Sequence, residues 1–107
     1  LKASKTQEAW ITPTLLNAWT GVTGQTPFYM KDEMGFVHCK GTATTGALAT
    51  VMFNLPVGYR PGQTRSYPTS ANGVYGRLNV SSDGAIVFAG GAPTNVYLDV
   101  ITFRAEV

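Results

Sequence analysis

Leu55-Pro56-Val57-Gly58-Tyr59-Arg60-Pro61 is the stretch that most constrains the path of this chain. It follows a short apolar segment and precedes a polar segment that begins at Gln63. Regular secondary structure is excluded there, because proline lacks an N–H donor and glycine is costly to order. The chain must leave one strand, cross an ordered corner and enter another. Tyr59 and Arg60 lie mid-corner, where a ring and a guanidinium can stack, seal a sheet edge or hold a ligand.

Short β-type segments extend in both directions from this corner. Apolar residues follow a period of two more often than one of 3.6, so no helical core is expected. Turn signals separate the segments at Asp32-Glu33-Met34-Gly35, Ala71-Asn72-Gly73 and Ser81-Ser82-Asp83-Gly84. The expected strands span residues 26–30, 36–42, 50–55, 64–70, 74–80, 85–88 and 95–106, after an irregular strand or arm at 10–19. About eight short strands at this spacing predict an all-β antiparallel sandwich, jelly-roll-like in its connections.

The last expected strand is apolar on both faces. Val96, Leu98 and Val100 alternate with Tyr97, Ile101 and Phe103. Such a strand must be covered on both sides. One cover is the sandwich core, and we expect the other to be a neighbouring subunit.

Size and composition favour a single domain that does not bind nucleic acid and does not insert into a membrane. The chain has 107 residues, of which 13% are charged, compared with roughly 25% in ordinary soluble proteins. Its net charge of +2 comes from scattered basic residues that form no stripe. No stretch approaches the roughly 20 apolar residues that span a bilayer, and Cys39 has no second cysteine to pair with.

We expect residues 10–107 to form the domain and residues 1–9 to be a lead-in or the end of a stalk. The first residues contain neither an initiator methionine nor a signal-peptide core. The chain is therefore expected to be the C-terminal part of a longer protein.

Catalytic and metal-binding constellations are not expected. His38 is the single histidine, and on a strand its neighbour Cys39 points to the opposite face, so the two cannot form a dyad. One histidine and one cysteine do not supply the three or four ligands of a zinc site. The acidic turns at Asp32 and Asp83 are better explained by local side-chain hydrogen bonds than by calcium binding. The sequence therefore indicates a protein that is not an enzyme and has no cofactor.

Ligand binding is more plausible, because aromatic rings stack on sugars, and arginine donates to phosphates and hydroxyl groups. The candidates outside the expected core are Tyr59, Arg60, Arg65, Tyr67, Tyr75 and Arg77. Each has an alternative interpretation. Tyr59 and Tyr67 would also serve to close the ends of the sandwich, and Arg77 would serve as a solvated or inter-subunit charge.

A family resemblance rests on several motifs in order. They are Thr14-Leu15-Leu16-Asn17-x-Trp19, Gly35-Phe36-Val37-His38 leading to Lys40-Gly41, the proline corner, Asp83-Gly84, and Leu98-Asp99-x-Ile101-x-Phe103-Arg104-Ala105-Glu106. From about Trp10 to its end the chain resembles the C-terminal head or receptor-binding module of tail-fibre and appendage proteins from phages of Gram-positive bacteria.

The resemblance implies a homotrimeric head at the tip of a virion fibre, joined to the fibre through its N-terminus. Such a head adsorbs to cell-wall polysaccharide or teichoic acid at the host surface. Two alternatives stay open: a C-terminal trimerisation or assembly module without a ligand, and a carbohydrate-binding module of a wall hydrolase. The latter is expected to be monomeric. A cytokine-like or complement-like trimeric sandwich has less support.

Overall fold

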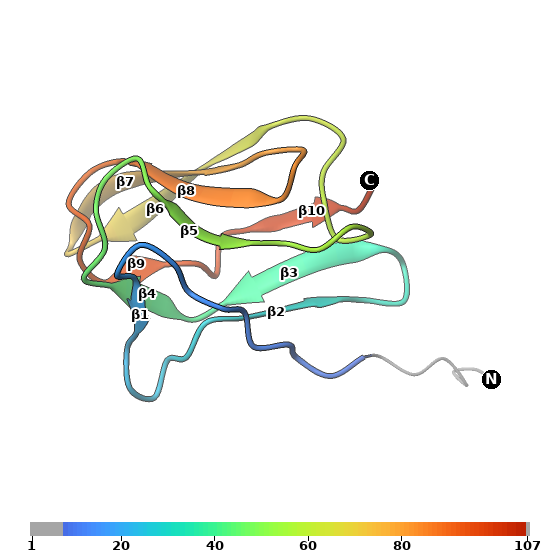
Figure 1. Ribbon diagram of the computed structural model, residues 1–107, viewed down its shortest axis with the longest axis horizontal. Coiled ribbons are helices and arrows are strands. Elements are labelled where there is room, and N and C mark those ends of the chain that lie inside the picture. Colours follow the sequence, from blue (N-terminus) through green and yellow to red (C-terminus); the bar gives the residue numbers. More distant parts are fainter. Residues whose placement is uncertain (1–7, 107) are drawn as a thin grey trace.

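The structure, a computed structural model, describes residues 8–106 (Figure 1). These residues form ten strands and no helix. The strands are β1 (Thr20–Gly21), β2 (Phe28–Lys31), β3 (Phe36–Lys40), β4 (Thr42–Thr44), β5 (Val51–Asn54), β6 (Arg65–Ala71), β7 (Val74–Val80), β8 (Ala85–Gly90), β9 (Val96–Tyr97) and β10 (Thr102–Arg104). Most of the expected lead-in lies outside the described residues.

The strands form two antiparallel sheets around one core. The larger sheet has the order β1-β4-β9-β6-β7-β8-β5, and the smaller has the order β10-β3-β2. Neighbours such as β4 and β9 are distant in the sequence, which is typical of jelly-roll-like connections. The prediction of an all-β antiparallel sandwich is confirmed, with ten strands in place of about eight.

The hairpin turns lie where the sequence predicted them. Asn72 and Gly73 have φ of 52° and 79° and form a two-residue turn between β6 and β7, where Ala71 pairs with Val74. The Asp32 Oδ1 atom accepts the backbone N–H groups of Met34 and Phe36 at 2.9 and 3.0 Å in the β2–β3 turn. These are the local side-chain bonds expected of acidic turns.

Two expected strands are each divided, because the chain passes there from one sheet to the other. Gly41, with φ of 105°, separates β3 of the smaller sheet from β4 of the larger. A Cβ at this position would lie 2.5 Å from the Thr26 carbonyl oxygen, so no larger residue fits without movement. The second crossing lies at residues 98–101, where the Ile101 N–H donates to the Leu98 carbonyl at 3.1 Å. The crossings bond to each other, since the Gly41 N–H donates to Asp99 Oδ1 at 2.8 Å.

This second crossing corrects the prediction for the last strand. Residues 95–106 are not one strand with two apolar faces: β9 belongs to the larger sheet and β10 to the smaller. The turn between them shifts the alternation, so Leu98, Ile101 and Phe103 all enter the same core. Tyr97 and Val100 are partly exposed. The strand with two apolar faces that suggested a neighbouring subunit is therefore not present, although Tyr97 and Val100 are exposed, and the homotrimer stays a prediction.

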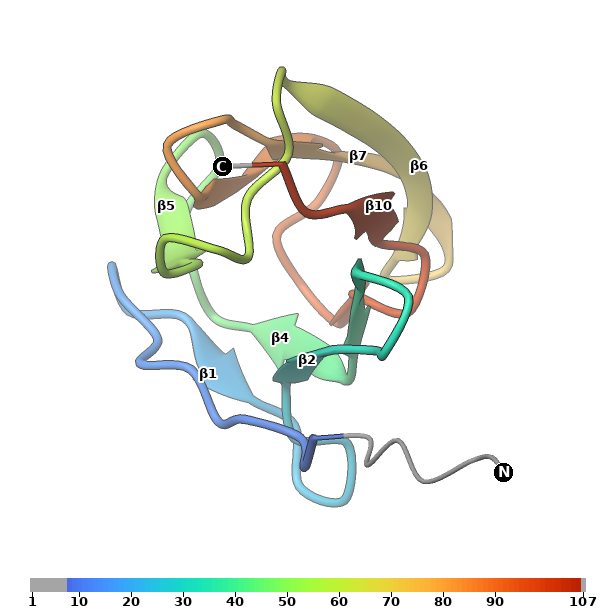
Figure 2. The same cartoon turned by 90° about the vertical axis from the view of Figure 1, so that its right-hand side faces the viewer.

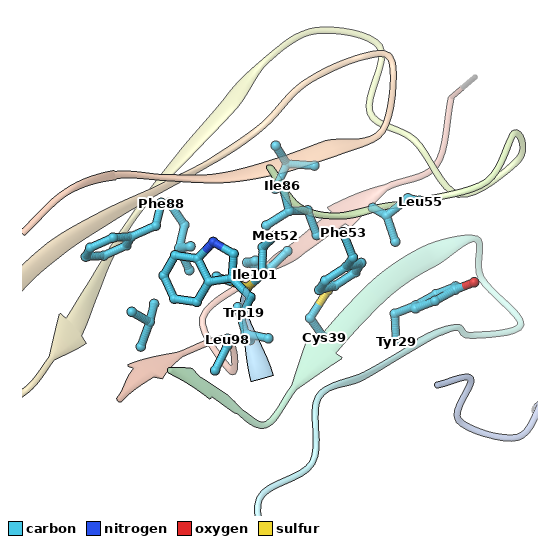
Figure 3. Packing of buried hydrophobic residues seen from close by; sticks show 14 of the residues in the cluster. Trp19, Tyr29, Cys39, Met52, Phe53, Leu55, Ile86, Phe88, Leu98 and Ile101 are labelled. Carbon is cyan, nitrogen blue, oxygen red and sulfur yellow. The ribbon is translucent and has the colours of Figure 1, made fainter. Parts of the chain in front are cut away.

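The core between the sheets combines aromatic with aliphatic side chains (Figure 3). Trp19 is 2% exposed and meets Phe88 edge-on, with ring centroids 6.1 Å apart. Its indole N–H donates to Thr50 Oγ1 at 3.1 Å. Phe53 and Phe88 are fully buried, each contributing about 1.5–3 kcal/mol. Trp19 thus anchors the 10–19 arm, whereas Trp10 lies at the surface.

The proline corner is ordered by contacts from distant parts of the chain. The Arg60 Nε–H donates to the Leu55 carbonyl at 2.8 Å, which closes the corner on itself. The Glu106 N–H donates to the Arg60 carbonyl at 2.8 Å, and Lys31 Nζ donates to the Gly58 carbonyl at 3.0 Å. The corner therefore joins the β5–β6 connection to β2 and to the segment after β10.

The two sheets leave a seam between β6 and β10, which lie beside each other in the view along the long axis (Figure 2). β10 pairs with β3, and β6 pairs with β7 and, at Ala71, with β9. No backbone ladder joins β6 to β10 within residues 8–106.

Candidate functional site

The Tyr59 hydroxyl and the Arg60 Nε–H are engaged within the fold. The Tyr59 hydroxyl donates to the carboxylate of Glu8, with distances of 2.8 and 3.0 Å to its two oxygens. Its ring meets Tyr29 edge-on at 5.5 Å, and Lys31 Nζ lies 4.8 Å from the ring centroid. Burial, followed by the hydrogen bond to Glu8, raises the pKa of Tyr59 to about 12. The corner therefore has a clear structural role.

Arg65 and Tyr67 lie together on β6 at the seam. The Tyr67 ring packs against the core, and its hydroxyl donates to the Thr102 carbonyl of β10 at 2.8 Å. Burial raises the pKa of Tyr67, and the positive charge of Arg65 opposes this shift. Arg65 itself is exposed at the start of the strand.

A groove of about 400 Å³ runs along this seam. We call it the seam groove; it is lined by Phe36, Arg65, Ser66, Tyr67, Thr102, Phe103 and Arg104. Arg104 and Phe36 face each other across the β10–β3 pair and are both exposed. Arg65 and Tyr67 were candidates from the sequence, whereas Arg104 and Phe36 were not. The available signal was their place in two of the family motifs, Phe103-Arg104-Ala105-Glu106 and Gly35-Phe36-Val37-His38.

Tyr75 and Arg77 lie elsewhere. Arg77 pairs with Pro68, so it is on the opposite face of the β6–β7 ribbon from Arg65 and Tyr67. Tyr75 is 68% exposed at the hairpin tip and lines a shallow hollow with Val74. The six candidate residues therefore lie in three places: the corner, the seam and the outer face of the hairpin.

An aromatic and cationic cluster that was not predicted from the sequence lies on the outer face of the smaller sheet. Lys40 Nζ lies 4.3 Å from the Trp10 ring centroid and 5.3 Å from that of Phe28. Phe28 and Lys40 line a groove that ends at Asp99, whose carboxylate is bonded to the Gly41 N–H. The ammonium of Lys40 is thus already placed against aromatic rings of the same chain.

His38 has the structural surroundings expected of a strand histidine. Its Nε2 atom lies 2.8 Å from Asp32 Oδ2, and its Nδ1 atom lies 3.4 Å from Thr102 Oγ1. The hydrogen bond from His38, then that from the Phe36 N–H, lowers the pKa of Asp32. Cys39 is buried on the opposite face, where burial raises its pKa to about 12. The two side chains do not form a dyad.

Residues 8–106 contain no group of three or more His, Cys, Asp or Glu side chains placed to hold a metal ion. In the same part of the chain, no helix is long and apolar enough to cross a membrane.

The fold is shared with a phage protein. No family model matches the sequence, and no match was found among curated proteins. Among solved structures, the chain is similar to the crystal structure of the receptor binding protein (gp15) of Listeria phage PSA, with a TM-score of 0.80 and 17% sequence identity. The similarity covers 94% of this chain and 67% of that protein. At this identity the likeness establishes the two-sheet sandwich fold.

Proposed function

We propose that this chain is the host-attachment head of a phage tail fibre or appendage. It acts on the virion at the surface of a Gram-positive bacterium and binds a wall glycan or teichoic acid. The observation that carries the proposal is the likeness to a phage receptor binding protein over 94% of the chain. That likeness agrees with the motif set of the sequence, which resembles the same class of module.

The composition and surface fit this function. With 13% charged residues, the chain is poorly suited to general ionic adhesion. Exposed aromatic side chains at Trp10, Phe36 and Tyr75 offer ring faces and edges on which sugars can pack. A homotrimer on a fibre would present three copies of any such site, and several fibres would multiply weak single contacts into strong adhesion.

The test is labelling of intact cells. The fluorescently tagged chain is applied to a panel of Gram-positive strains, including Listeria, and to Gram-negative strains as a control. Saturable labelling of some Gram-positive strains, blocked by excess untagged chain, is expected. Labelling of no strain, or equal labelling of all, would contradict the attachment function.

A second candidate is a monomeric carbohydrate-binding module of a wall hydrolase. It is favoured by one observation: Leu98, Ile101 and Phe103 are all buried within a single chain and require no neighbouring subunit. Light scattering behind a sizing column separates the candidates. For the attachment head, the expected solution mass is near three times the chain mass of 11.4 kDa. For the hydrolase module, it is near the mass of a single chain and does not change on dilution.

A further inference from the structure

Two arginines distinguish the seam groove from the other hollows of the surface. Arg65 begins β6 of the larger sheet, and Arg104 ends β10 of the smaller. Within residues 8–106, the ion pair found is that of His38 with Asp32, and neither guanidinium takes part in a hydrogen bond. Two like charges along one groove repel each other, and this repulsion is relieved by an anion bound between them.

The neutral polar groups of the seam groove are engaged within the chain. The Tyr67 hydroxyl donates to the Thr102 carbonyl, and the Ser66 hydroxyl donates to Asn79 Oδ1 at 2.8 Å. The guanidinium groups are therefore the free donors of the groove. The partly exposed ring of Phe36 supplies an apolar wall beside Arg104. A ligand for this groove should carry a negative charge next to a carbon skeleton.

In the other grooves, each cation already has a contact within the chain. The Arg60 Nε–H donates to the Leu55 carbonyl, and Lys31 Nζ donates to the Gly58 carbonyl. Lys40 lies against Trp10 and Phe28. The hollow at the β6–β7 tip is lined by Pro68, Thr69, Ser70, Gly73, Val74 and Tyr75, none of which is charged.

The arrangement favours phosphate over carboxylate. A guanidinium presents a planar fork of N–H donors, and one fork is enough to pair with a planar carboxylate. Arg65 and Arg104 come from different sheets and approach the groove from two sides. A tetrahedral phosphate offers oxygens in more than one plane and can accept from both.

We propose that the seam groove binds the phosphate of a phosphodiester-linked sugar or polyol, with Arg65 and Arg104 donating to its oxygens and Phe36 contacting the carbon skeleton. The inference deepens the attachment function proposed above and rests on it for the polymeric source of the ligand. The polymer would occupy one groove per chain, so several chains on one fibre could hold it at several repeats.

The test uses small probes and the whole 107-residue chain. Amide and arginine side-chain NMR signals are followed during titration with glycerol 3-phosphate, glucuronate and glycerol. Shifts confined to the seam groove are expected with glycerol 3-phosphate, with at least about tenfold weaker effects from glucuronate. Equal affinity for glucuronate would overturn the assignment to phosphate, and no shifts in the groove would overturn the site.

Three variants make the assignment to residues. R65Q and R104Q should each weaken glycerol 3-phosphate binding at least about tenfold. R77Q is the matched control, because Arg77 is an exposed arginine on the opposite face of the same hairpin. An equal loss in R77Q would show that net charge governs binding and would overturn the proposal.

Failure of this inference can be told apart from failure of the attachment function. If the unaltered chain labels cells and R65Q and R104Q label them equally well, the groove is not the attachment site, while the attachment function stands. If the groove binds glycerol 3-phosphate and no cell is labelled, the groove assignment stands and the attachment function falls.

Discussion

The hydroxyl of Tyr67 donates to the backbone carbonyl of Thr102 over 2.8 Å and so connects β6 of the larger sheet to β10 of the smaller. Within residues 8–106, no strand pairing spans this seam. The bond therefore helps to set the position of Arg104 relative to Arg65, which lie on the two sides of the seam groove.

Removing this hydroxyl should weaken the contact between β6 and β10 without creating a cavity in the core. Tyr67→Phe keeps the ring and loses one hydrogen bond, so the free energy of unfolding should fall by about 0.5–1.5 kcal/mol. Urea unfolding measures the change, and Tyr75→Phe at the exposed hairpin tip is the control, with no loss expected. Equal stability of the two variants would mean that the bond does not hold the seam.

Gly84 and Gly73 should respond differently to alanine although both have positive φ, 91° and 79°. A Cβ at Gly73 would meet nothing within 4 Å, so G73A should cost about 1–2 kcal/mol from backbone strain. A Cβ at Gly84 would collide with the Leu55 carbonyl and lie 2.8 Å from Arg60 Nε. G84A should therefore destabilise the fold distinctly more than G73A in urea unfolding. Similar losses would contradict the close approach of the 81–84 turn to the corner.

The Cys39 thiol should be unreactive in the native protein. Burial raises its pKa to about 12, so almost no thiolate forms at mildly alkaline pH, and the side chain is 4% exposed. Reaction with a chromogenic disulfide should be slow in buffer and fast in concentrated guanidinium chloride. Rapid reaction in buffer would show that the smaller sheet opens readily.

Asp32 should make the fold sensitive to acid. Its folded-state pKa is lowered, first by the hydrogen bond with His38, so its stabilising effect is present above the ordinary aspartate pKa of about 4. That contribution is lost as the pH falls through the lowered folded-state value. Asp32→Asn should flatten the fall in urea midpoint below about pH 4. Parallel pH profiles of the two proteins would contradict a role for this carboxylate.

Local chemistry was enough to predict the turns, and long-range contacts account for what was missed. Asn72-Gly73 and Asp83-Gly84 favour their turns through local groups: Asn72 and Gly73 adopt positive φ, and the Ala85 N–H donates to Asp83 Oδ1. Gly41 ends a strand because its backbone approaches Thr26, fifteen positions earlier. The apolar positions up to Phe103 fit one strand with two apolar faces as well as two strands separated by a turn, so sequence alone could not reveal the crossing between sheets.

The same reasoning applies to the candidate site. Arg65 and Tyr67 share a strand face, and their types marked them as candidates. Arg104 lies near them because it lines the same groove from β10. Phe36 lies near them because it pairs with Arg104 across β3 and β10. No spacing along the chain encodes that neighbourhood, because it depends on how the two sheets are placed. In the most conspicuous pair of the sequence, the Tyr59 hydroxyl and the Arg60 Nε–H prove to be engaged in holding the corner.

Binding to isolated cell walls tests the attachment function most directly. Walls from the Gram-positive panel are sedimented with increasing amounts of the 107-residue chain, before and after removal of phosphodiester-linked polymers with hydrofluoric acid. The expected result is saturable binding to walls of some strains that disappears from the stripped walls. Absence of saturable binding to any wall would contradict the host-attachment function, and undiminished binding to stripped walls would contradict a phosphodiester ligand.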